Sequence, residues 1–247
     1  RRVQMGLPSN DSRKLLISEL LFDPPGTGTD YIELYNASEN IINLQLIRIA
    51  NRNSAGEVAA KKSLSANPRY IFPGEWLAFT AMPQWLGRQF HVRDPAKIIS
   101  VPSLPSWPND RGTAILLDDK DSVLDELQYD AGWHFELLGN TEGVALERKD
   151  YTTATQSAAN WFSASSNAGY GTPGYANSQA NTTSGKGREI WPEPTLFTPN
   201  QDGIDDQCHF KYRFDKPGYV LTIKIFTTLR STTKAWKKNT GCRWWAW

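Results

Sequence analysis

Hydrophobic residues along most of the chain alternate with polar ones over short runs, and few recur at helical spacing. The runs are separated by segments rich in Pro, Gly, Asn and Asp, which favour turns. The predicted strands are Leu15–Leu21, Tyr31–Asn36, Ile42–Ile49, Glu75–Thr80, Lys97–Val101, Thr113–Leu117, Ser122–Tyr129 and Gly143–Arg148. Only residues 81–89, AMPQWLGRQ, predict a helical turn, with Pro83 in its first turn. The pattern predicts an all-β fold, an antiparallel sandwich.

A second β module is predicted after residues 163–188, which are small, polar and rich in Gly, as in a linker. Apolar and polar residues alternate over Cys208–Phe214 and again over Tyr219–Phe226, with Pro217-Gly218 between them. Two such runs joined by a short turn predict a hairpin. We divide the chain into an N-terminal extension (1–13), a β-sandwich (14–178), a linker (179–193) and a partial second module (194–247).

Charge and composition exclude two broad classes. Lys and Arg total 27 against 26 for Asp and Glu, so a net charge of +1 provides no global field for nucleic acid or an acidic membrane. No run of about 18 apolar residues occurs, so no membrane-spanning helix is expected. The chain opens with Arg1-Arg2 without an initiator Met, which we interpret as a processed or excised piece.

The two cysteines, Cys208 and Cys242, are too few for a disulfide framework. A pair between them stays open, and a buried free Cys208 is the favoured interpretation.

Four segments carry a resemblance to the lamin tail domain family. They are "LLISELLFDPPGTGTDYIELYNASENIINLQLIRIANR", "FPGEWLAFT", "GVALERK" and "YGTPGYANSQ". The resemblance covers about residues 14–178, and the insertion at 81–112 departs from the family pattern. It implies an immunoglobulin-like β-sandwich, used by nuclear lamins as an interaction surface. Bacterial versions occur in secreted or surface proteins, sometimes beside nuclease or phosphatase domains.

The stretch "PTLFTPNQDGIDD" and the strand after it resemble the start of Ig-like C-terminal modules on secreted and gliding-associated proteins of Bacteroidetes. Those modules often serve as signals for export by the type IX system. Residues 230–247 depart from that pattern and have no steady period, so a truncated module without a working export signal is expected.

Residues 198–209 form an oxygen-rich loop that does not fit an EF-hand. With Gly203 at position 6, position 12 falls on His209, where a bidentate Glu is needed. Two interpretations stay open: a weak structural calcium site, or a turn of Asn and Asp side chains around Gly203, which we favour. The oxygen ligands for such a calcium ion would be Asn200, Asp202, Asp205 and Asp206. No other cofactor is predicted.

Two groups of residues are candidates for binding. Trp107 and Trp133 lie in predicted loops, where they either stack on sugars and partners or cap the ends of the sandwich. A basic patch near the first hairpins is a weak candidate for nucleic acid, against the favoured alternative of a solvated hairpin tip. The patch comprises Arg48, Arg52, Lys61, Lys62 and Arg69.

Signs of catalysis are few. Glu19, Asp23, Asp30 and Glu33 form an acidic set, but alternation predicts that Glu33 faces solvent, as a charge on an edge strand. The histidines lack metal spacing, and no G-x-S-x-G elbow or phosphate loop occurs.

We therefore predict a non-enzymatic binding or scaffolding module of a secreted or cell-surface bacterial protein. Its predicted partner is a protein or a polysaccharide, recognised by loops at one end of the sandwich. The alternatives are an accessory domain of an extracellular nuclease or phosphoesterase, and a purely structural spacer.

Overall fold

The chain divides into two compact units, Arg1–Asn181 and Thr182–Trp247. A computed structural model describes residues 8–9, 11–136, 138–180, 189–193, 206–213, 224–225 and 234–235. The first unit holds the long sheets, and the described parts of the second unit form two small two-stranded sheets.

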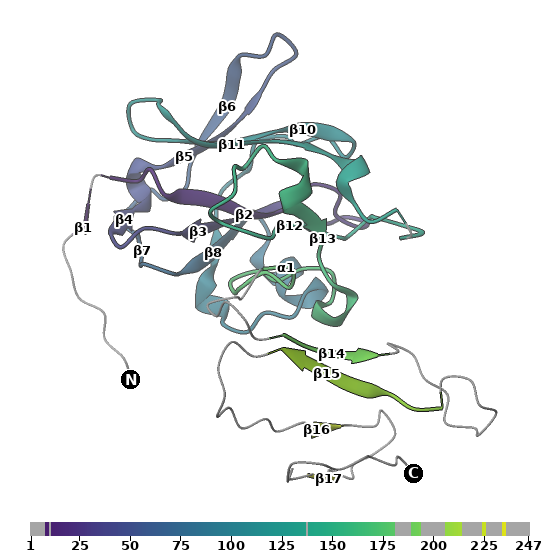
Figure 1. Cartoon of the computed structure of the whole chain (residues 1–247). Coiled ribbons are helices and arrows are strands. Elements are labelled where there is room, and N and C mark those ends of the chain that lie inside the picture. The colour runs from purple at the N-terminus through teal and green to yellow at the C-terminus, as the bar shows by residue number, and fades with distance from the viewer. Residues whose placement is uncertain are drawn as a thin grey trace. The chain divides into compact units, whose positions relative to one another are not determined.

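The first unit is an all-β sandwich of two main layers, visible in Figure 1. One layer is a six-stranded sheet in the order β13-β12-β2-β3-β8-β9, antiparallel except for the β8–β9 pair. Its strands are β2 (Leu15–Leu21), β3 (Tyr31–Asn36), β8 (Trp76–Thr80), β9 (Ile98–Ser100), β12 (Leu146–Arg148) and β13 (Trp161–Ser163).

The opposing layer is a four-stranded antiparallel sheet in the order β11-β10-β5-β6. Its strands are β5 (Arg48–Arg52), β6 (Val58–Ser63), β10 (Arg111–Leu117) and β11 (Val123–Asp130). A small third sheet joins β1 (Pro8–Ser9), β4 (Ile41–Asn43) and β7 (Tyr70–Ile71).

Helices are short in the described residues. The α-helix α1 (Pro83–Gln89) has Pro83 at its start, as predicted. The 3-10 turns are η1 (Leu44–Leu46), η2 (Pro95–Lys97), η3 (Ala131–Trp133), η4 (Ala158–Asn160) and η5 (Ser166–Ala168).

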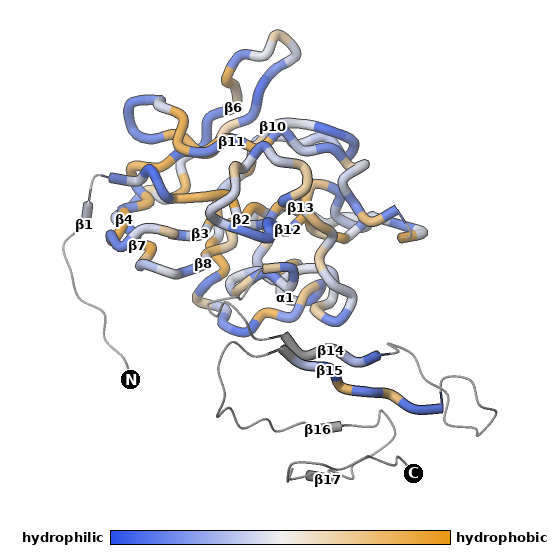
Figure 2. The backbone as a smooth tube through the Cα atoms, viewed as in Figure 1, coloured by the Kyte–Doolittle hydropathy of each residue, from blue (hydrophilic) through white to orange (hydrophobic). Residues whose placement is uncertain are grey.

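The main core lies between the two layers, where Figure 2 shows hydrophobic residues concentrated along β2 and its neighbours. It includes Leu15, Ile17, Leu20 and Phe22 of the β2 region, packed with Ile32, Leu34, Leu116, Leu127 and Trp161. A second cluster covers part of the other face of the six-stranded sheet and includes Leu21, Tyr31, Ala78, Leu86 and Phe90. The six-stranded sheet is therefore covered on both faces.

Several predicted boundaries differ from the structure. The run Ile42–Ile49 is divided by η1, because the Asn43 side chain accepts a hydrogen bond from Gln45 N and caps a 3-10 turn there. The predicted strands do not include β1, β6, β7 or β13, since none of these has a long alternating run. The remaining predicted strands coincide with or overlap β2, β3, β8, β9, β10, β11 and β12.

The second unit also differs from its predicted hairpin. Strand β15 (His209–Arg213) pairs with β14 (Glu189–Glu193), which lies in the range predicted as linker. Strand β16 (Lys224–Ile225) pairs with β17 (Lys234–Ala235). Cys208 is half-buried instead of buried, and Cys242 lies outside the described residues.

Candidate functional site

Three glutamates lie side by side across the middle of the six-stranded sheet. Glu147 on β12 is opposite Glu19 on β2, and Glu19 is opposite Glu33 on β3. All three side chains have 0% exposure, and they point away from the main core. We call Glu19, Glu33 and Glu147 the carboxyl row. Like charges directly opposite on neighbouring strands destabilise a sheet, so this arrangement needs a physical explanation.

A β-bulge brings Glu19 into the row. Strict alternation from Leu15 and Ile17, which are in the main core, would turn Glu19 into that core as well. The register shifts between Ile17 and Glu19, so Ser18 is the extra residue and Leu20 becomes the next core position. The bulge therefore moves the carboxyl group to the opposite face of the sheet.

Residues 171–179 cover the carboxyl row, and we call them the closing segment. Thr172 N donates to Glu19 Oε1 at 2.9 Å, and Gly174 N donates to Glu33 Oε2 at 2.7 Å. Glu147 accepts hydrogen bonds from Thr172 Oγ1 at 2.8 Å, Ser178 Oγ at 2.7 Å and Gln179 N at 2.8 Å. Each carboxyl group thus fixes part of the segment over the sheet.

The enclosure changes how the row ionises. Burial raises the pKa of Glu19 well above its ordinary value, and the nearby Glu147 adds to the effect. Burial also raises the pKa of Glu33, with Glu19 as the second cause. Both groups therefore keep their protons at pH values where a free glutamate ionises. A protonated Glu19 can donate to Thr172 Oγ1, 3.2 Å from its Oε2, while that hydroxyl donates to Glu147.

A solvent-open pocket of about 410 Å³ lies between the closing-segment region and the loop after α1. Its polar and aromatic lining is His91, Arg93, Ser165, Asn167, Tyr175 and Ser178. The Arg93 guanidinium lies 3.9 Å from the centre of the Tyr175 ring, and the His91 ring meets Tyr175 edge-on at 6.5 Å. Ser178 connects the pocket with the carboxyl row, because its hydroxyl donates to Glu147.

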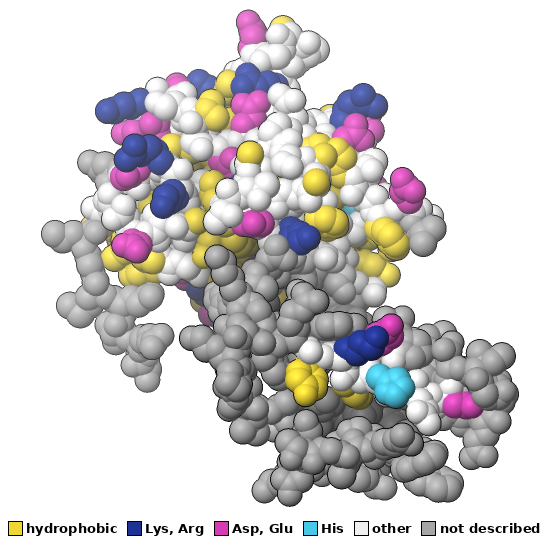
Figure 3. Space-filling view, viewed as in Figure 1, with side chains coloured by type: hydrophobic (Ala, Val, Ile, Leu, Met, Phe, Trp, Pro, Cys, Tyr) yellow, Lys and Arg dark blue, Asp and Glu magenta, His cyan; other side chains and the backbone are white. Residues whose placement is uncertain are grey.

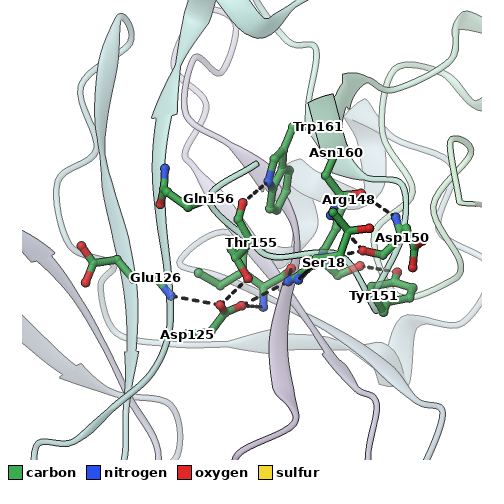
Figure 4. Close-up of polar contacts among 12 residues, drawn as sticks. Ser18, Asp125, Glu126, Arg148, Asp150, Tyr151, Thr155, Gln156, Asn160 and Trp161 are labelled. Atoms are coloured by element: carbon green, nitrogen blue, oxygen red, sulfur yellow. Dashed lines mark hydrogen bonds and ion pairs between the residues drawn. The ribbon is translucent and has the colours of Figure 1, made fainter. Parts of the chain in front are cut away.

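Arg148, the residue after Glu147 on β12, forms a buried ion pair with Asp125, and Figure 4 shows the polar contacts around it. Arg148 Nη1 lies 3.3 Å from Asp125 Oδ2, and the side chains are 2% and 7% exposed. Asp125 also accepts from Ile17 N at 2.9 Å and Thr155 Oγ1 at 2.5 Å. Arg148 donates to the carbonyl of Thr153 at 2.7 Å. The pair connects β11, β2 and β12, and its burial assigns it a structural role.

The tryptophans predicted to bind ligands lie elsewhere. Trp107 is 3% exposed and belongs to the main core, so the binding role predicted for it is wrong: its ring is not available to a ligand. Trp133 is half-buried and packs against the same core. Both rings cover the hydrophobic interior, which was the alternative interpretation of these loops.

Three of the five basic residues of the patch form ion pairs, with two carboxylates between them. Arg48 and Lys61 both pair with Asp121 at 3.0 Å, and Arg52 makes a two-pronged pair with Glu126 at 2.6 and 2.8 Å. Figure 3 shows such basic and acidic side chains lying next to one another on the face that it draws. Lys62 is half-buried and Arg69 is exposed. These ion pairs lower the positive charge that the predicted patch offers to nucleic acid, and Lys62 and Arg69 are in none of them.

The prediction that Glu33 faces solvent on an edge strand is wrong. Alternation correctly turns it away from the main core, but the closing segment covers that face, and β3 lies between β2 and β8. Asp30, from the same acidic set, has a pKa raised to about 7 by burial and by Asp23.

The pocket residues His91 and Arg93 lie in the insertion at 81–112, which departs from the family pattern, and Tyr175 lies in "YGTPGYANSQ". The resemblance of "YGTPGYANSQ" to the lamin tail family was the sequence feature that could have drawn attention to Tyr175.

Asn200, Asp202 and Asp205 of the predicted calcium loop lie outside the described residues, and Asp206 is half-buried. Within the described ranges, no group of three or more His, Cys, Asp or Glu side chains is placed to hold a metal ion. In the same part of the chain, no helix is long and apolar enough to cross a membrane.

A comparison with models of known protein families finds no match, and a comparison with curated proteins finds no similar sequence. The function is therefore argued from the site itself.

Proposed function

We propose that the chain is a non-catalytic binding module of a secreted or cell-surface bacterial protein, with a lamin-tail-like, immunoglobulin-like sandwich as its frame. Its ligand is a polysaccharide, which binds in the pocket formed by His91, Arg93 and Tyr175. The observation that carries the proposal is this pocket, which is open to solvent and combines an aromatic ring with polar donors. Binding sites of this kind fix orientation by a few placed polar groups.

Hydrogen bonds hold one wall of the pocket in place, so the binding surface is preformed. Ser165, Asn167, Tyr175 and Ser178 come from the end of the first unit. Gly174 N and Gln179 N donate to buried carboxyl groups and fix the backbone on either side of Tyr175 and Ser178. Ser165 N also donates to Ser178 Oγ at 2.8 Å, which connects the two ends of this wall. A wall already held in place loses little conformational entropy when a ligand binds.

The chemistry of the pocket favours a polysaccharide over a protein. Stable protein interfaces bury about 1,200–2,000 Å² and depend on apolar or aromatic anchors at a dry centre. This pocket is small, and most of its lining residues carry a polar group that can bond to sugar hydroxyls. A protein partner is the second candidate, because Phe135 is 61% exposed and Phe162 is 38% exposed on the edge strand β13. Phe135 N bonds Ser163 Oγ, which places the two aromatic residues in the same region.

The buried position of the reactive-looking groups supports a non-catalytic role. The carboxyl row is fully enclosed, so it does not reach a substrate. His134 Nδ1 lies 2.9 Å from Ser163 Oγ, a pairing that also occurs in hydrolases. Yet these residues are only 6% and 8% exposed. Burial lowers the pKa of His134 to about 4. The pair therefore connects the end of η3 to β13 and is largely shielded from solvent.

The test is the affinity of the full chain for a panel of soluble polysaccharides, measured for the wild type and for Tyr175→Ala. We expect at least one polysaccharide to bind, with affinity at least tenfold lower in the variant because the ring that supports Arg93 is lost. Tyr70→Ala is the matched control, since Tyr70 is 40% exposed on β7 and does not line the pocket. Equal binding by Tyr175→Ala and wild type would show that the pocket is not the site.

A further inference from the structure

Arg93 has no acidic partner among the described residues, unlike several other basic residues of the first unit. Arg48, Arg52, Lys61, Lys97 and Arg148 each pair with a carboxylate. Arg93 forms no ion pair or hydrogen bond with any described residue, and its described contact is with the Tyr175 ring. The carboxylate next to it in sequence, on Asp94, accepts a hydrogen bond from Ala96 N and caps η2.

The geometry leaves the donors of Arg93 available. A guanidinium lying over an aromatic ring keeps the N–H groups at its planar edge free for a ligand. That edge matches the two oxygens of a carboxylate or the oxygens of a sulfate. The His91 imidazole adds a second nitrogen-bearing side chain to the same lining, and no described Asp or Glu lines the pocket. Ser165 and Asn167 add polar groups that suit sugar hydroxyls.

We infer that the pocket recognises an oxyanion group on a polysaccharide, the carboxylate of a uronic acid or a sulfate ester, and that Arg93 binds this group. The inference rests on the proposed function of the pocket and specifies its ligand class. Tyr175 holds the guanidinium in place, and the neighbouring hydroxyl and amide groups contact the sugar ring.

The carboxyl row beneath the pocket does not cancel this charge. Glu147, the member connected to the pocket through Ser178, already accepts hydrogen bonds from three donors. Burial raises the pKa of Glu19 and of Glu33, which favours their neutral forms. The row thus carries less negative charge than three ordinary glutamates would, and Arg93 and His91 line the pocket itself.

The experiment measures binding of the full chain to polygalacturonate and to the same polymer with its carboxyl groups methyl-esterified, at low and moderate salt. Dextran sulfate and dextran form a second pair, which distinguishes a sulfate from a carboxylate. Binding is compared for the wild type, Arg93→Gln and Arg88→Gln. Arg88 is the matched control, because it is an exposed arginine of α1 outside the pocket, and its loss changes the net charge equally.

We expect the anionic polymer of one pair to bind at least tenfold more tightly than its neutral form. Arg93→Gln should weaken that binding at least tenfold, as expected from the loss of charge-assisted hydrogen bonds, and Arg88→Gln should leave it unchanged. Equal weakening by both variants would indicate general charge attraction and would overturn the inference.

The remaining outcomes separate the inference from the proposed function. A neutral polymer bound as tightly as its anionic form, with binding lost in Tyr175→Ala, would overturn the oxyanion inference and leave the polysaccharide site standing. Failure of all four polymers to bind would overturn the oxyanion inference, and the wider polysaccharide panel with Tyr175→Ala would then decide the proposed function separately.

Discussion

The buried pair of Asp125 and Arg148 allows a sharp test of what stabilises the sandwich. In Asp125→Ala, Arg148 stays 2% exposed without its counter-ion, and Ile17 N and Thr155 Oγ1 lose their acceptor. Removing one partner of a buried ion pair typically costs about 3–5 kcal/mol of unfolding free energy. We expect a loss in this range, because charge and hydrogen bonds are lost together.

The next residue along β11 provides the control. Glu126 also pairs with an arginine, Arg52, at shorter distances. The Glu126 side chain is 20% exposed and the Arg52 side chain is 29% exposed. Pairs open to solvent contribute about 0–1 kcal/mol, because water replaces the lost partner. Glu126→Ala should therefore cost at most about 1 kcal/mol, despite the better geometry of its pair.

The assay is chemical denaturation of the full chain followed by near-UV circular dichroism, with midpoints compared at equal slope. The double variant Asp125→Ala/Arg148→Met completes a mutant cycle. It should lose less stability than the sum of the single variants, since no uncompensated charge remains. If Asp125→Ala shifted the midpoint no more than Glu126→Ala, burial of the pair would not be the source of its contribution.

Three further predictions concern the carboxyl row, His134 and the closing segment. Because Glu19 and Glu33 have raised pKa values in the fold, the stability they contribute is present below the unfolded value of 4.5 and is lost as pH rises through the folded values. As the pH of the melting experiment is raised from 4.5 to 9, the double variant Glu19→Gln/Glu33→Gln should lose less stability than the wild type. His134 has its pKa lowered to about 4 by burial, so its ring should stay neutral at pH 5.5 in an NMR titration. A charged ring at that pH would show that the site is hydrated. Gly174→Ala should destabilise by about 1–3 kcal/mol, since φ is +84° and a Cβ would lie 2.7 Å from Lys97 Cβ. Its control, Gly87→Ala in α1, meets nothing within 4 Å and should be neutral or stabilising in thermal unfolding.

Much of the sandwich follows from local pattern. Alternation and turn residues predict β2 and β3 with the bounds they have in the structure, and Pro83 marks the first turn of α1. These elements follow from short-range rules, because side-chain direction in a strand depends only on the position within that strand.

The candidate site is less predictable because its parts are distant in sequence. Arg93 contacts Tyr175, which lies in a different segment of the chain, and Glu33 bonds to Gly174 across a separation of 141 residues. Trp107 occurs in a Pro-rich stretch typical of a loop, yet its side chain fills the main core. The basic residues of the first hairpins looked unpaired because Asp121 and Glu126 come from strands and turns much later in the chain.

The amino-acid sequence alone determined the class of fold and the face of the sheet toward which Glu33 points. Tertiary structure decided whether that face meets water, because the closing segment that covers it is fixed only when β12, β2 and β3 lie side by side. Tertiary structure also decided toward which face of the sheet Glu19 points, because the bulge in β2 forms only when β2 pairs with β3. The physical reason is the same in each case. The period of a strand gives the direction of a side chain, whereas its burial, its pKa and its partners depend on what another part of the chain places over it.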